Sequence, residues 1–435
     1  MNVLLIGSGA REHTIAWQLV QSPFLTKLWV ADGNAGTASI ATNLAIKPED
    51  VDGIVAAAKS LEIDLVVVGP ELPLSLGIVD RLASRGIAAF GPTKAAARIE
   101  TSKSFALEIM EEAGVPRPDF WVFQEESSAL KFLKGHPGPV VVKADGLAAG
   151  KGVILCGNAS EAADAVRACM NDRAFGEAGD TVVIEEMLTG PEVSVFAFSD
   201  GEHISSLAAA CDYKRLEDGN RGPNTGGMGS YSPPSFWDQE LAHQVEHTIM
   251  RPVVETMARR GAPYKGVLYA GLMLTVDGPK VLEFNCRLGD PETQVLLPRL
   301  ATDPLDVFQA CVEGRLDQVP VIWENQCYVG VVLASGGYPG SYETGFAISG
   351  AEVSEEGTML FHAATRQESA GDKIQLVTSG GRVSTVVGRG DSLAEARARA
   401  YDRARRISFQ GAIFRTDIAK VGEEHSITKS RANHL

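Results

Sequence analysis

Residues 140–156 read VVVKADGLAAGKGVILC, in which three glycines and two lysines lie between two apolar runs. A phosphate-binding P-loop needs four residues between its glycines and a hydroxyl side chain after its lysine. Here three residues separate Gly146 from Gly150, and Gly152 follows Lys151. Another apolar run comes next, and a helical pattern begins only after it. The segment therefore predicts a hairpin, which is either a mobile lid over a nucleotide or an ordinary flexible turn.

The composition indicates about three domains in a chain of 435 residues. The formal net charge of −15 disfavours nucleic-acid and membrane partners, because such polyanionic surfaces select basic patches. Six cysteines occur without a C-x-x-C pair, so neither a zinc site nor a disulfide framework is indicated. The amino terminus, MNVLLIG, enters an apolar strand without a basic leader, and we expect a cytoplasmic location.

The first domain alternates short apolar strands, such as NVLLIG at 2–7 and DLVVVG at 64–69, with helical segments, including one at 73–86. This alternation predicts a doubly wound parallel sheet whose ligand edge lies at the carboxyl ends of its strands. Three turns follow those ends, at 7–9, 32–37 and 69–71, and they should cluster in space. A nicotinamide dinucleotide site is an alternative, but Glu12 stands where the third fingerprint glycine belongs. A phosphate at this helix start is also compatible with the pattern.

A change of pattern follows near residue 103, where a helix begins that should end at Gly114. The middle of the chain is rich in strands and hairpins, so it is expected to be antiparallel. Beyond about residue 325, the strand-like GGRVSTVVGRG and the helical SLAEARARAYDRARRI indicate a small α+β domain.

The stretch at 271–294, GLMLTVDGPKVLEFNCRLGDPETQ, offers the clearest metal site. A turn at Asp277-Gly278 makes KVLEFNCR the return strand of a hairpin, and the period of two then places Glu283, Asn285 and Arg287 on one face. A carboxylate and a carboxamide are oxygen ligands that suit Mg²⁺, and an arginine beside them can bind an anion. The alternative is a strand whose polar face simply meets water.

Two glycine-rich loops and one helix also bear on function. The loops at 211–233 and 288–292 can expose main-chain amides to phosphate or carboxylate oxygens, or they can be solvated connections. His243 and His247 match the H-x-x-E-H metalloprotease pattern on a helix. No third ligand follows them, so we interpret the histidines as surface residues at helical spacing.

Taken in order, IGSGAREH, GNAGT, VGPE, KADGLAAGKGV, GPNTGGMGSYSP and EFNCRLGDPET closely resemble the phosphoribosylamine–glycine ligase family of ATP-grasp enzymes. The resemblance runs from residue 1 to about residue 420. It implies a Rossmann-like substrate domain at 1–102, an ATP-grasp domain at 103–325 with a mobile lid at about 124–190, and an α+β domain at 326–425. It also implies ATP-dependent joining of glycine to 5-phosphoribosylamine through glycyl phosphate, in purine biosynthesis, by a monomer.

The resemblance further implies roles for individual residues. The ATP site would comprise Lys103, Lys143, Gly146, Gly150, Lys151, Gly152, Glu185, Glu186, Met187, Leu188 and Glu192. The glycine and phosphoribosylamine sites would comprise Gly9, Asn34, Gly36, Thr37, Pro70, Glu71, Asp212, Lys214, Asn224, Thr225, Gly226, Arg287, Asp290 and Pro291. The catalytic cations would be Lys151, Lys214 and Arg287, and Glu283 with Asn285 would bind Mg²⁺ or Mn²⁺.

The chain departs from the family pattern at Ala10, where glycine is frequent, and at Tyr213, where histidine is frequent. Neither departure removes a charged group, so only fine substrate contacts are affected. Two other functions are compatible with the motifs. One is another ATP-grasp carboxylate ligase or a biotin-dependent carboxylase component, and the other is a nucleotide sensor without turnover. A sensor would not need Arg287 beside both metal ligands.

Overall fold

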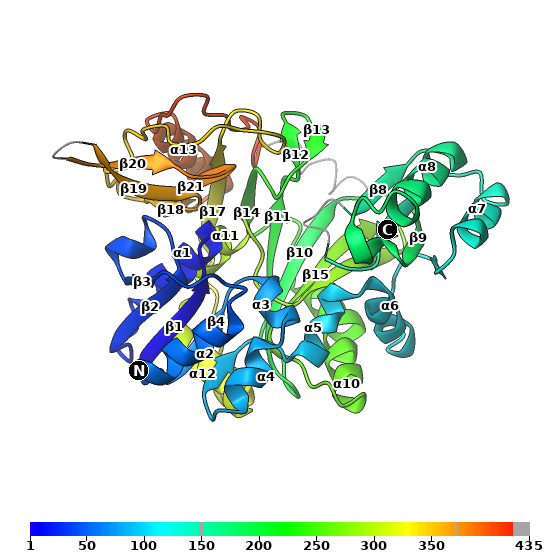
Figure 1. Ribbon diagram of the computed structural model, residues 1–435, viewed down its shortest axis with the longest axis horizontal. Helices are drawn as coiled ribbons and strands as arrows, with labels where there is room; N and C mark the ends of the chain where they lie inside the picture. Colours follow the sequence, from blue (N-terminus) through cyan, green and yellow to red (C-terminus); the bar gives the residue numbers. More distant parts are fainter. Residues whose placement is uncertain (148–151, 371–372, 421–435) are drawn as a thin grey trace.

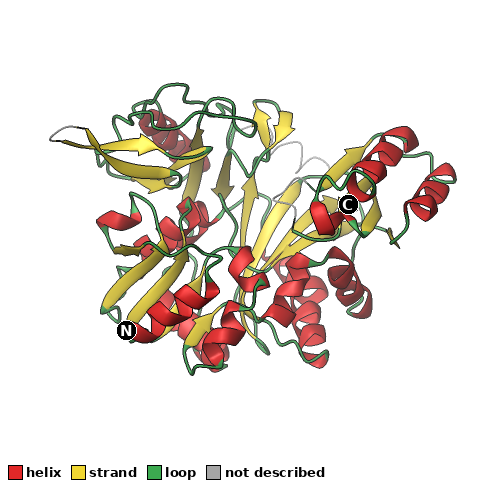
Figure 2. Cartoon of the chain, in the orientation of Figure 1, coloured by secondary structure: helices red, strands yellow, loops and turns green. Residues whose placement is uncertain are grey.

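The computed structural model describes residues 1–147, 152–370 and 373–420 and contains three larger sheets (Figure 1). The longest sheet runs through the middle of the molecule and continues into the C-terminal domain at the upper left, with the N-terminal domain at the lower left and the lid at the right. Helices and strands alternate or mix in each region (Figure 2), which confirms the predicted combination of α/β and α+β architecture.

The N-terminal domain is a five-stranded parallel sheet of order β3-β2-β1-β4-β5, as the alternating pattern predicted. In the central strand, Leu4 and Ile6 belong to one buried cluster and Val3 and Leu5 to another, because successive side chains point to opposite covered faces. The strands are β1 (Asn2–Gly7), β2 (Lys27–Asp32), β3 (Thr42–Leu44), β4 (Leu65–Val68) and β5 (Ala88–Phe90). The helical segments are α1 (Ala10–Leu19), η1 (Thr37–Ser39), α2 (Val51–Ser60), α3 (Glu71–Ser75), α4 (Ile78–Ala83) and α5 (Lys94–Thr101).

The segment at 73–86 forms two short helices, so the prediction of one helix was wrong. Gly77, between α3 and α4, has a φ of +84°, a left-handed conformation that glycine adopts without the steric penalty of a Cβ atom. The chain turns there, and Glu71 lies in the first turn of α3, directly beyond the carboxyl end of β4.

The lid has its own four-stranded antiparallel sheet, of order β6-β9-β7-β8, and its own buried cluster, which includes Val142, Val166 and Ile184. Its elements are β6 (Phe120–Phe123), α7 (Glu126–Lys134), β7 (Val140–Ala144), β8 (Val153–Cys156), α8 (Ala159–Met170), η2 (Gly176–Gly179) and β9 (Val182–Glu186). β7 and β8 pair antiparallel, which confirms the predicted hairpin. Residues 148–151 of that hairpin, including Gly150 and Lys151, lie outside the described residues.

The longest sheet has eight strands in the order β16-β15-β10-β11-β14-β17-β21-β18 and joins the middle region to the C-terminal domain. Its strands are β10 (Glu192–Asp200), β11 (Ala208–Asp212), β14 (Gly229–Ser232), β15 (Lys265–Thr275), β16 (Gly278–Asn285), β17 (Cys327–Ala334), β18 (Thr358–His362) and β21 (Arg382–Gly390). Neighbouring strands pair antiparallel throughout, as expected for the middle region. The turn between β15 and β16 falls at the predicted Asp277-Gly278.

The remaining elements cover this sheet or extend from it. They are α6 (Lys103–Glu112), β12 (Arg215–Glu217), β13 (Arg221–Asn224), α9 (Gln239–Val245), η3 (Glu246–Met250), α10 (Arg251–Arg259), α11 (Thr293–Leu296), η4 (Leu297–Arg299), α12 (Pro304–Glu313), η5 (Leu316–Gln318), β19 (Thr365–Ala370), β20 (Lys373–Thr378) and α13 (Leu393–Ala404). None of the helices in the described part of the chain has the length and apolarity needed to cross a bilayer.

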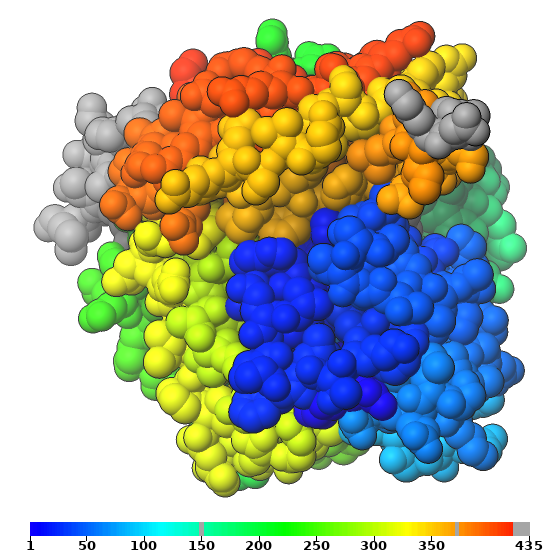
Figure 3. Space-filling view, turned by 90° about the vertical axis from the view of Figure 1, so that its left-hand side faces the viewer, coloured from blue at the N-terminus to red at the C-terminus, as the bar shows by residue number. Residues whose placement is uncertain are grey.

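The N-terminal domain shares a buried core with the rest of the molecule. Phe90 of β5 stacks on Phe308 of α12 with ring centroids 4.2 Å apart, and Phe198 of β10 lies 6.0 Å from Phe308. All three rings belong to one buried cluster. In Figure 3 the N-terminal domain, in blue, lies directly against the C-terminal domain, in orange. The first domain therefore packs against both later regions.

We expect Phe308→Ala to lower the free energy of unfolding by about 3–5 kcal/mol, because it removes a buried ring and leaves a cavity between two domains. Urea unfolding followed by tryptophan fluorescence would measure the change. Phe24→Ala is the matched control, since Phe24 is 60% exposed, and it should change stability by less than about 0.5 kcal/mol. Equal effects of the two substitutions would contradict the shared core.

Candidate active site

Lys143 and Glu185 form a buried ion pair at the base of the lid. They lie on adjacent strands β7 and β9, with Nζ 2.7 Å from Oε2 and side chains that are 7% and 4% exposed. Lys143 also donates to the Leu282 carbonyl of β16, at 2.8 Å. A buried pair is stable only when further hydrogen bonds offset its desolvation. These contacts fix the Lys143 ammonium between the lid and the long sheet.

Lys103 lies at the start of α6, beside the lid hairpin. Its Nζ donates to the Gly146 carbonyl at 3.3 Å, while Ser104 donates to the Asp145 carboxylate through both its main-chain nitrogen and its hydroxyl. Burial lowers the pKa of Lys103, and the acidic neighbours, Glu283 first, only partly oppose this effect. A polyanion bound here would favour the charged form of Lys103, so the geometry suits phosphate groups.

The other residues predicted to contact ATP lie along the same side of the molecule. Glu186, Met187 and Leu188 follow the buried part of β9 and are exposed or half-buried. Gly152 is buried, and its carbonyl accepts a hydrogen bond from Ala144. The described members of the predicted ATP site thus come from α6, the lid hairpin, β9 and the start of β10. Their contacts with ATP stay predictions.

Glu283 and Asn285 occupy alternate positions of β16, as the sequence period predicted. Within the described residues the Glu283 carboxylate has no hydrogen bond or ion pair. The Asn285 amide is buried, its Oδ1 accepts from Arg287 at 3.2 Å, and its Nδ2 has no partner among the described residues. While it accepts from Arg287, Oδ1 keeps a second lone pair that could bind a cation. The pair fits a hard cation that takes two protein oxygens.

Arg287 joins the N-terminal domain to the end of β16. Its Nε lies 3.1 Å from Glu71 Oε2, and its second terminal nitrogen lies 2.9 Å from Glu100 Oε1. Glu100 also accepts the main-chain N–H of Cys286 at 2.7 Å. Burial opposes the Arg287 charge, but Glu100 and Glu71 hold the pKa of Arg287 well above its usual value. The sequence did not indicate Glu100, which sits in the unremarkable helical stretch KAAARIET.

The first turn of the chain is closed by its own side chains. Glu12 is buried, accepts the Gly9 N–H at 2.7 Å and pairs with Arg11 at 2.5 Å. A Cβ atom at Gly7 would lie 2.5 Å from Glu12, so the turn tolerates no side chain there. The carboxylate thus uses an amide at the helix start that a phosphate would need, which disfavours the dinucleotide alternative.

Arg11 and Asp290 connect this turn to the loop after β16. Arg11 donates to the Leu288 carbonyl at 3.1 Å, and a Cβ atom at Gly9 would lie 3.2 Å from the Asp290 carboxylate. Burial opposes ionisation of Asp290, but Arg382 and Arg11 hold its pKa below the usual value. The first turn and the loop after β16, almost three hundred residues apart in the sequence, therefore lie in contact. The predicted clustering of substrate residues requires such a contact.

The turn at residues 32–37 packs beside the first turn of the chain. The Asn34 amide donates to the carbonyls of Ser8 and His362, and it accepts the N–H groups of Gly36 and Thr37. Thr37 is fully buried. A Cβ atom at Gly36 would lie 2.2 Å from the His13 ring. These side chains hold the loop against the first turn and the C-terminal domain, and their contact with substrate stays a prediction.

Lys214 binds two carboxylates on the long sheet. Its Nζ lies 2.7 Å from Asp212 and 2.9 Å from Glu192. Burial opposes the charge, yet Asp212 and Glu192 hold the pKa of Lys214 well above its usual value. Glu192 and Lys214, predicted to bind ATP and substrate respectively, are thus in direct contact.

A buried carboxyl lies close to this group and was missed by the sequence analysis. Glu292 accepts a hydrogen bond from the Tyr269 hydroxyl at 2.9 Å and one from the Ser194 hydroxyl at 3.2 Å. Burial, and then the charge of Asp212, raises the pKa of Glu292. Its position in the GDPET stretch could have signalled it, but the sequence does not distinguish a buried carboxyl from an exposed one.

The glycine-rich stretch at 211–233 is less irregular than its composition suggested. It contains the short hairpin of β12 and β13, which the sequence analysis did not predict, while its contact with phosphate or carboxylate groups stays a prediction. Thr225 donates to the Lys214 carbonyl at 2.9 Å and thereby fixes the loop that carries Asn224 and Gly226. Tyr213 accepts the Ala419 N–H at 2.9 Å and faces the C-terminal domain.

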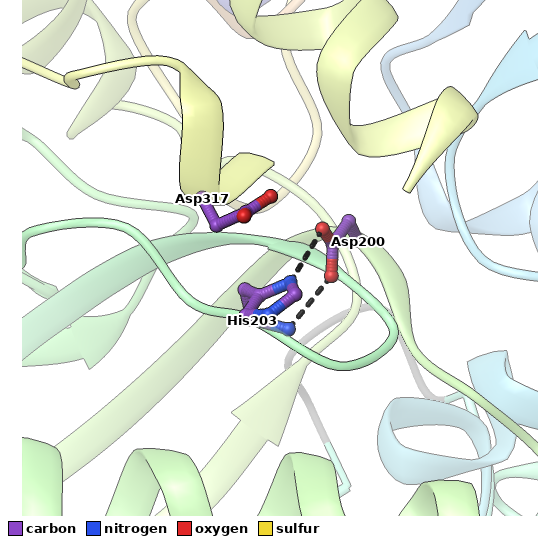
Figure 4. Close-up of side chains that lie close together, drawn as sticks. All are labelled: Asp200, His203 and Asp317. Carbon is purple, nitrogen blue, oxygen red and sulfur yellow. Dashed lines mark hydrogen bonds and ion pairs between the residues drawn. The ribbon is translucent and has the colours of Figure 1, made fainter. Parts of the chain in front are cut away.

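Two possible metal sites away from this region have structural explanations. His243 and His247 are exposed and stack on each other with centroids 3.9 Å apart. Asp200, His203 and Asp317 lie close together near the start of η5 (Figure 4). The Asp200 carboxylate already accepts the N–H groups of Glu202, His203 and Leu316 and binds the His203 ring at 3.1 Å. These bonds use its lone pairs to close a turn.

The geometry defines the class of protein. Paired lysines under a separate antiparallel lid, opposite an acidic strand end on a long sheet, are the framework of the ATP-grasp class. A family model described as the ATP-grasp domain of phosphoribosylglycinamide synthetase matches residues 101–293. Models for the N and C domains of the same protein match residues 1–100 and 328–421.

Individual relatives agree with these models. The phosphoribosylamine–glycine ligase of Rhodopirellula baltica is 47% identical, covering 96% of this chain and 97% of that protein. A solved structure of the ligase from Thermotoga maritima is 34% identical, covers 96% of this chain and 100% of that one, and superposes with a TM-score of 0.84. The chain belongs to the phosphoribosylglycinamide synthetase family.

A more distant structure shares only the fold. The biotin carboxylase domain of the 2-oxoglutarate carboxylase from Hydrogenobacter thermophilus is 15% identical, with a TM-score of 0.71 over 95% of this chain and 91% of that chain. That protein was solved with MgADP and bicarbonate. Its likeness supports the ATP-grasp architecture, and nucleotide use follows from that architecture.

The contact between Glu71 and Arg287 should make stability depend on pH. Burial alone would raise the pKa of Glu71, but Arg287 and Arg11 lower it from 4.5 to about 2. A carboxyl with a lowered folded pKa stabilises the protein above its unfolded pKa, and this contribution is lost as the pH falls toward the folded value. The stability difference between the native chain and Glu71→Gln should therefore be constant above about pH 5.5 and shrink as the pH falls from about 5 toward about 2.

Urea unfolding at several pH values would measure this difference. Glu49→Gln is the control, because Glu49 is an exposed carboxylate of the same domain, and its small effect should not change with pH in the same way. A constant difference for Glu71→Gln over the whole range would contradict the ion pair.

Proposed function

We propose that this chain joins glycine to 5-phosphoribosylamine with hydrolysis of ATP to ADP and phosphate, giving glycinamide ribonucleotide in purine biosynthesis. The observation that carries the proposal is the family match, which extends in order over all three domains. The relatives named phosphoribosylamine–glycine ligase match along nearly their whole length. The arrangement of the site also supports the proposal. Lysines lie beneath the lid, and a second group of charged residues lies on loops at the edge of the N-terminal sheet.

We infer a reaction in two steps, because a carboxylate is a poor acyl donor until it carries a good leaving group. A glycine carboxylate oxygen attacks the γ-phosphorus, the bond to the bridging oxygen breaks, and ADP leaves. The amine of phosphoribosylamine then attacks the carbonyl carbon of glycyl phosphate, the carbon–oxygen bond breaks, and phosphate leaves with the former carboxylate oxygen while the nitrogen loses a proton. The contribution of the protein is alignment and charge neutralisation.

The ATP residues fit the first step. Lys103 and Lys143 supply positive charge beside the lid, and we assign Lys151 of the lid hairpin, outside the described residues, the same role. Glu185, Glu186, Met187, Leu188 and Glu192 would line the adenine and ribose. We assign glycine and phosphoribosylamine to the region between the turns at Gly9 and Asn34 and the residues Glu71, Asp212, Lys214, Arg287 and Asp290.

A divalent cation fits the end of β16, where we propose that Glu283 and Asn285 hold Mg²⁺ or Mn²⁺. Among the described residues the Glu283 carboxylate has no hydrogen-bond or ion-pair partner, and the Asn285 Oδ1 beside it keeps a lone pair while it accepts from Arg287; both observations support this assignment. When bound, the ion would neutralise phosphate charge during transfer. Arg287, held by Glu71 and Glu100 beside Asn285, would orient the amide and add a fixed positive charge.

The carboxylase and sensor alternatives predict different chemistry. A carboxylase would release ADP in the presence of bicarbonate and biotin, and a sensor would not turn over. Among the described residues Cys156, Cys169, Cys286 and Cys311 form no disulfide, which suits the reducing conditions of the cytoplasm. The monomeric state and the absence of nucleic-acid and membrane partners stay predictions from the sequence.

We expect Glu283→Gln and Asn285→Ala each to lower activity at limiting Mg²⁺ and to recover part of it at excess Mg²⁺, because the first removes the negative charge of a ligand and the second removes an oxygen ligand. The loss should be about 10- to 100-fold. Activity measured against Mg²⁺ concentration, together with Mn²⁺ binding followed by electron paramagnetic resonance, would test this. Asp277→Asn, an exposed position of the same hairpin, is the control. Native metal affinity in both site variants would refute the assignment.

The function itself is tested by ADP release with ATP, glycine and phosphoribosylamine, omitting each in turn. Full turnover should require all three. With glycine labelled by heavy oxygen in its carboxyl group, each phosphate formed should carry one labelled atom, because a carboxylate oxygen leaves with it. Mass spectrometry of the phosphate would give the result. Amide product with unlabelled phosphate would exclude glycyl phosphate, and ADP release without need for glycine would exclude the ligase.

A further inference from the structure

Arg382, the first residue of β21, connects the C-terminal domain to both loops of the proposed substrate region. One of its terminal nitrogens donates to the Gly226 carbonyl at 2.6 Å and to the Asp290 carbonyl at 2.8 Å. The other lies 3.4 Å from the Asp290 carboxylate. The guanidinium therefore binds two segments that are more than sixty residues apart in the sequence.

Tyr338 also binds the main chain of Gly226. Its hydroxyl accepts the Gly226 N–H at 2.9 Å, so both main-chain polar groups of Gly226 are bound by side chains of the C-terminal domain. A Cβ atom at position 226 would lie 3.0 Å from the Arg382 guanidinium carbon and 3.2 Å from the Tyr338 hydroxyl. The absence of a side chain at 226 is thus what lets both groups approach the main chain.

The two loops also touch each other at the point where Arg382 holds them. Gly227 has a φ of +109°, and a Cβ atom there would lie 2.4 Å from the ring of Pro291. Arg382 is 23% exposed and Asp290 is 18% exposed, so the contact is at the wall of an accessible region and not in the core. The negative charge of Asp290 faces Arg382 on one side and the first turn of the N-terminal domain on the other.

The stem of the same loop is anchored independently of Arg382. Asp417 accepts the Gly219 N–H at 2.8 Å, and Arg415 donates to the Arg215 carbonyl at 2.9 Å. Thr416 donates its main-chain N–H to Asp218 at 2.8 Å. Because these contacts hold β12 and β13, loss of Arg382 should free the tip of the loop without releasing its base.

We propose that Arg382 and Tyr338 are positioning residues for the amine-bearing substrates. They hold the loop around Gly226 against Asp290, so that a charged carboxylate stays aligned to receive an amino group of glycine or phosphoribosylamine. The nucleotide side of the site, beneath the lid, has no described contact with either residue. The C-terminal domain thereby sets substrate affinity without touching ATP, and this inference rests on the proposed ligase activity.

The test compares Arg382→Gln, Arg382→Lys and Tyr338→Phe with a control, Arg405→Gln, which changes an exposed arginine at the C-terminal end of α13 in the same domain. Arg382→Gln should raise KM for glycine, for phosphoribosylamine or for both by about 10- to 100-fold, because a charge-assisted contact is lost. KM for ATP should change by less than about twofold. Arg382→Lys should recover part of the loss, since it keeps the charge but not the two-carbonyl contact. Tyr338→Phe should have a smaller effect in the same direction.

Hydrogen exchange in the unliganded protein gives a second measurement that does not depend on turnover. Main-chain amides at residues 225–228 should exchange faster in Arg382→Gln, while those of β12, β13 and the lid strands and the melting temperature match Arg405→Gln. The inference is overturned if all three KM values and the exchange equal those of Arg405→Gln. It is also overturned if KM for ATP and the melting temperature change together with the other KM values, which is the signature of general damage. If the native protein released ADP without needing glycine or phosphoribosylamine, the proposed function would be wrong. The hydrogen-exchange result would still show whether Arg382 positions the loop.

Discussion

The largely buried Arg287, whose side chain is 17% exposed, is the constraint around which the domains are arranged. It extends from the end of β16, yet its carboxylate partners, Glu71 and Glu100, both come from the N-terminal domain. An arginine this buried is tolerated only when its charge is matched and its donors are bound. The N-terminal sheet must therefore present its strand ends to β16 at a defined distance. Arg287 also donates to Asn285 Oδ1, so the domain interface helps to shape the proposed metal site.

The sequence predicted those features that depend on neighbours along the chain. The parallel sheet of the first domain, the hairpin of β7 and β8, and the common face of Glu283 and Asn285 all follow from short-range periodicity. The motifs that resemble the family also named most of the charged residues that the structure brings together. In each of these cases the relevant signal is contained within about twenty residues.

The features that escaped prediction depend on distant contacts. The hairpin of β12 and β13 is held by Arg415 and Asp417, about two hundred residues away in the sequence. The glycine-rich sequence of the hairpin does not indicate these distant partners. Glu100, in helix α5, and Glu292, in the turn before α11, are ordinary acidic residues in the sequence, and only folding places them beside Arg287 and Tyr269. Arg382 lies in a segment with a strand pattern, and the neighbouring residues give no sign of the distant groups that its charge contacts. Periodicity identifies the buried face of an element, but it does not identify what lies opposite.

The long sheet has a consequence for how the molecule can be divided. β14 of the middle region pairs with β17 of the C-terminal domain along four consecutive positions, Gly229–Val331 to Ser232–Tyr328. The family boundaries place a domain border between these strands, but the hydrogen-bond ladder crosses it without a gap. A chain cut at that border would expose the unpaired main chain of β14, whose residues are all buried in the whole protein. Such an edge is a template for pairing with other chains, so the shortened protein would be prone to aggregate.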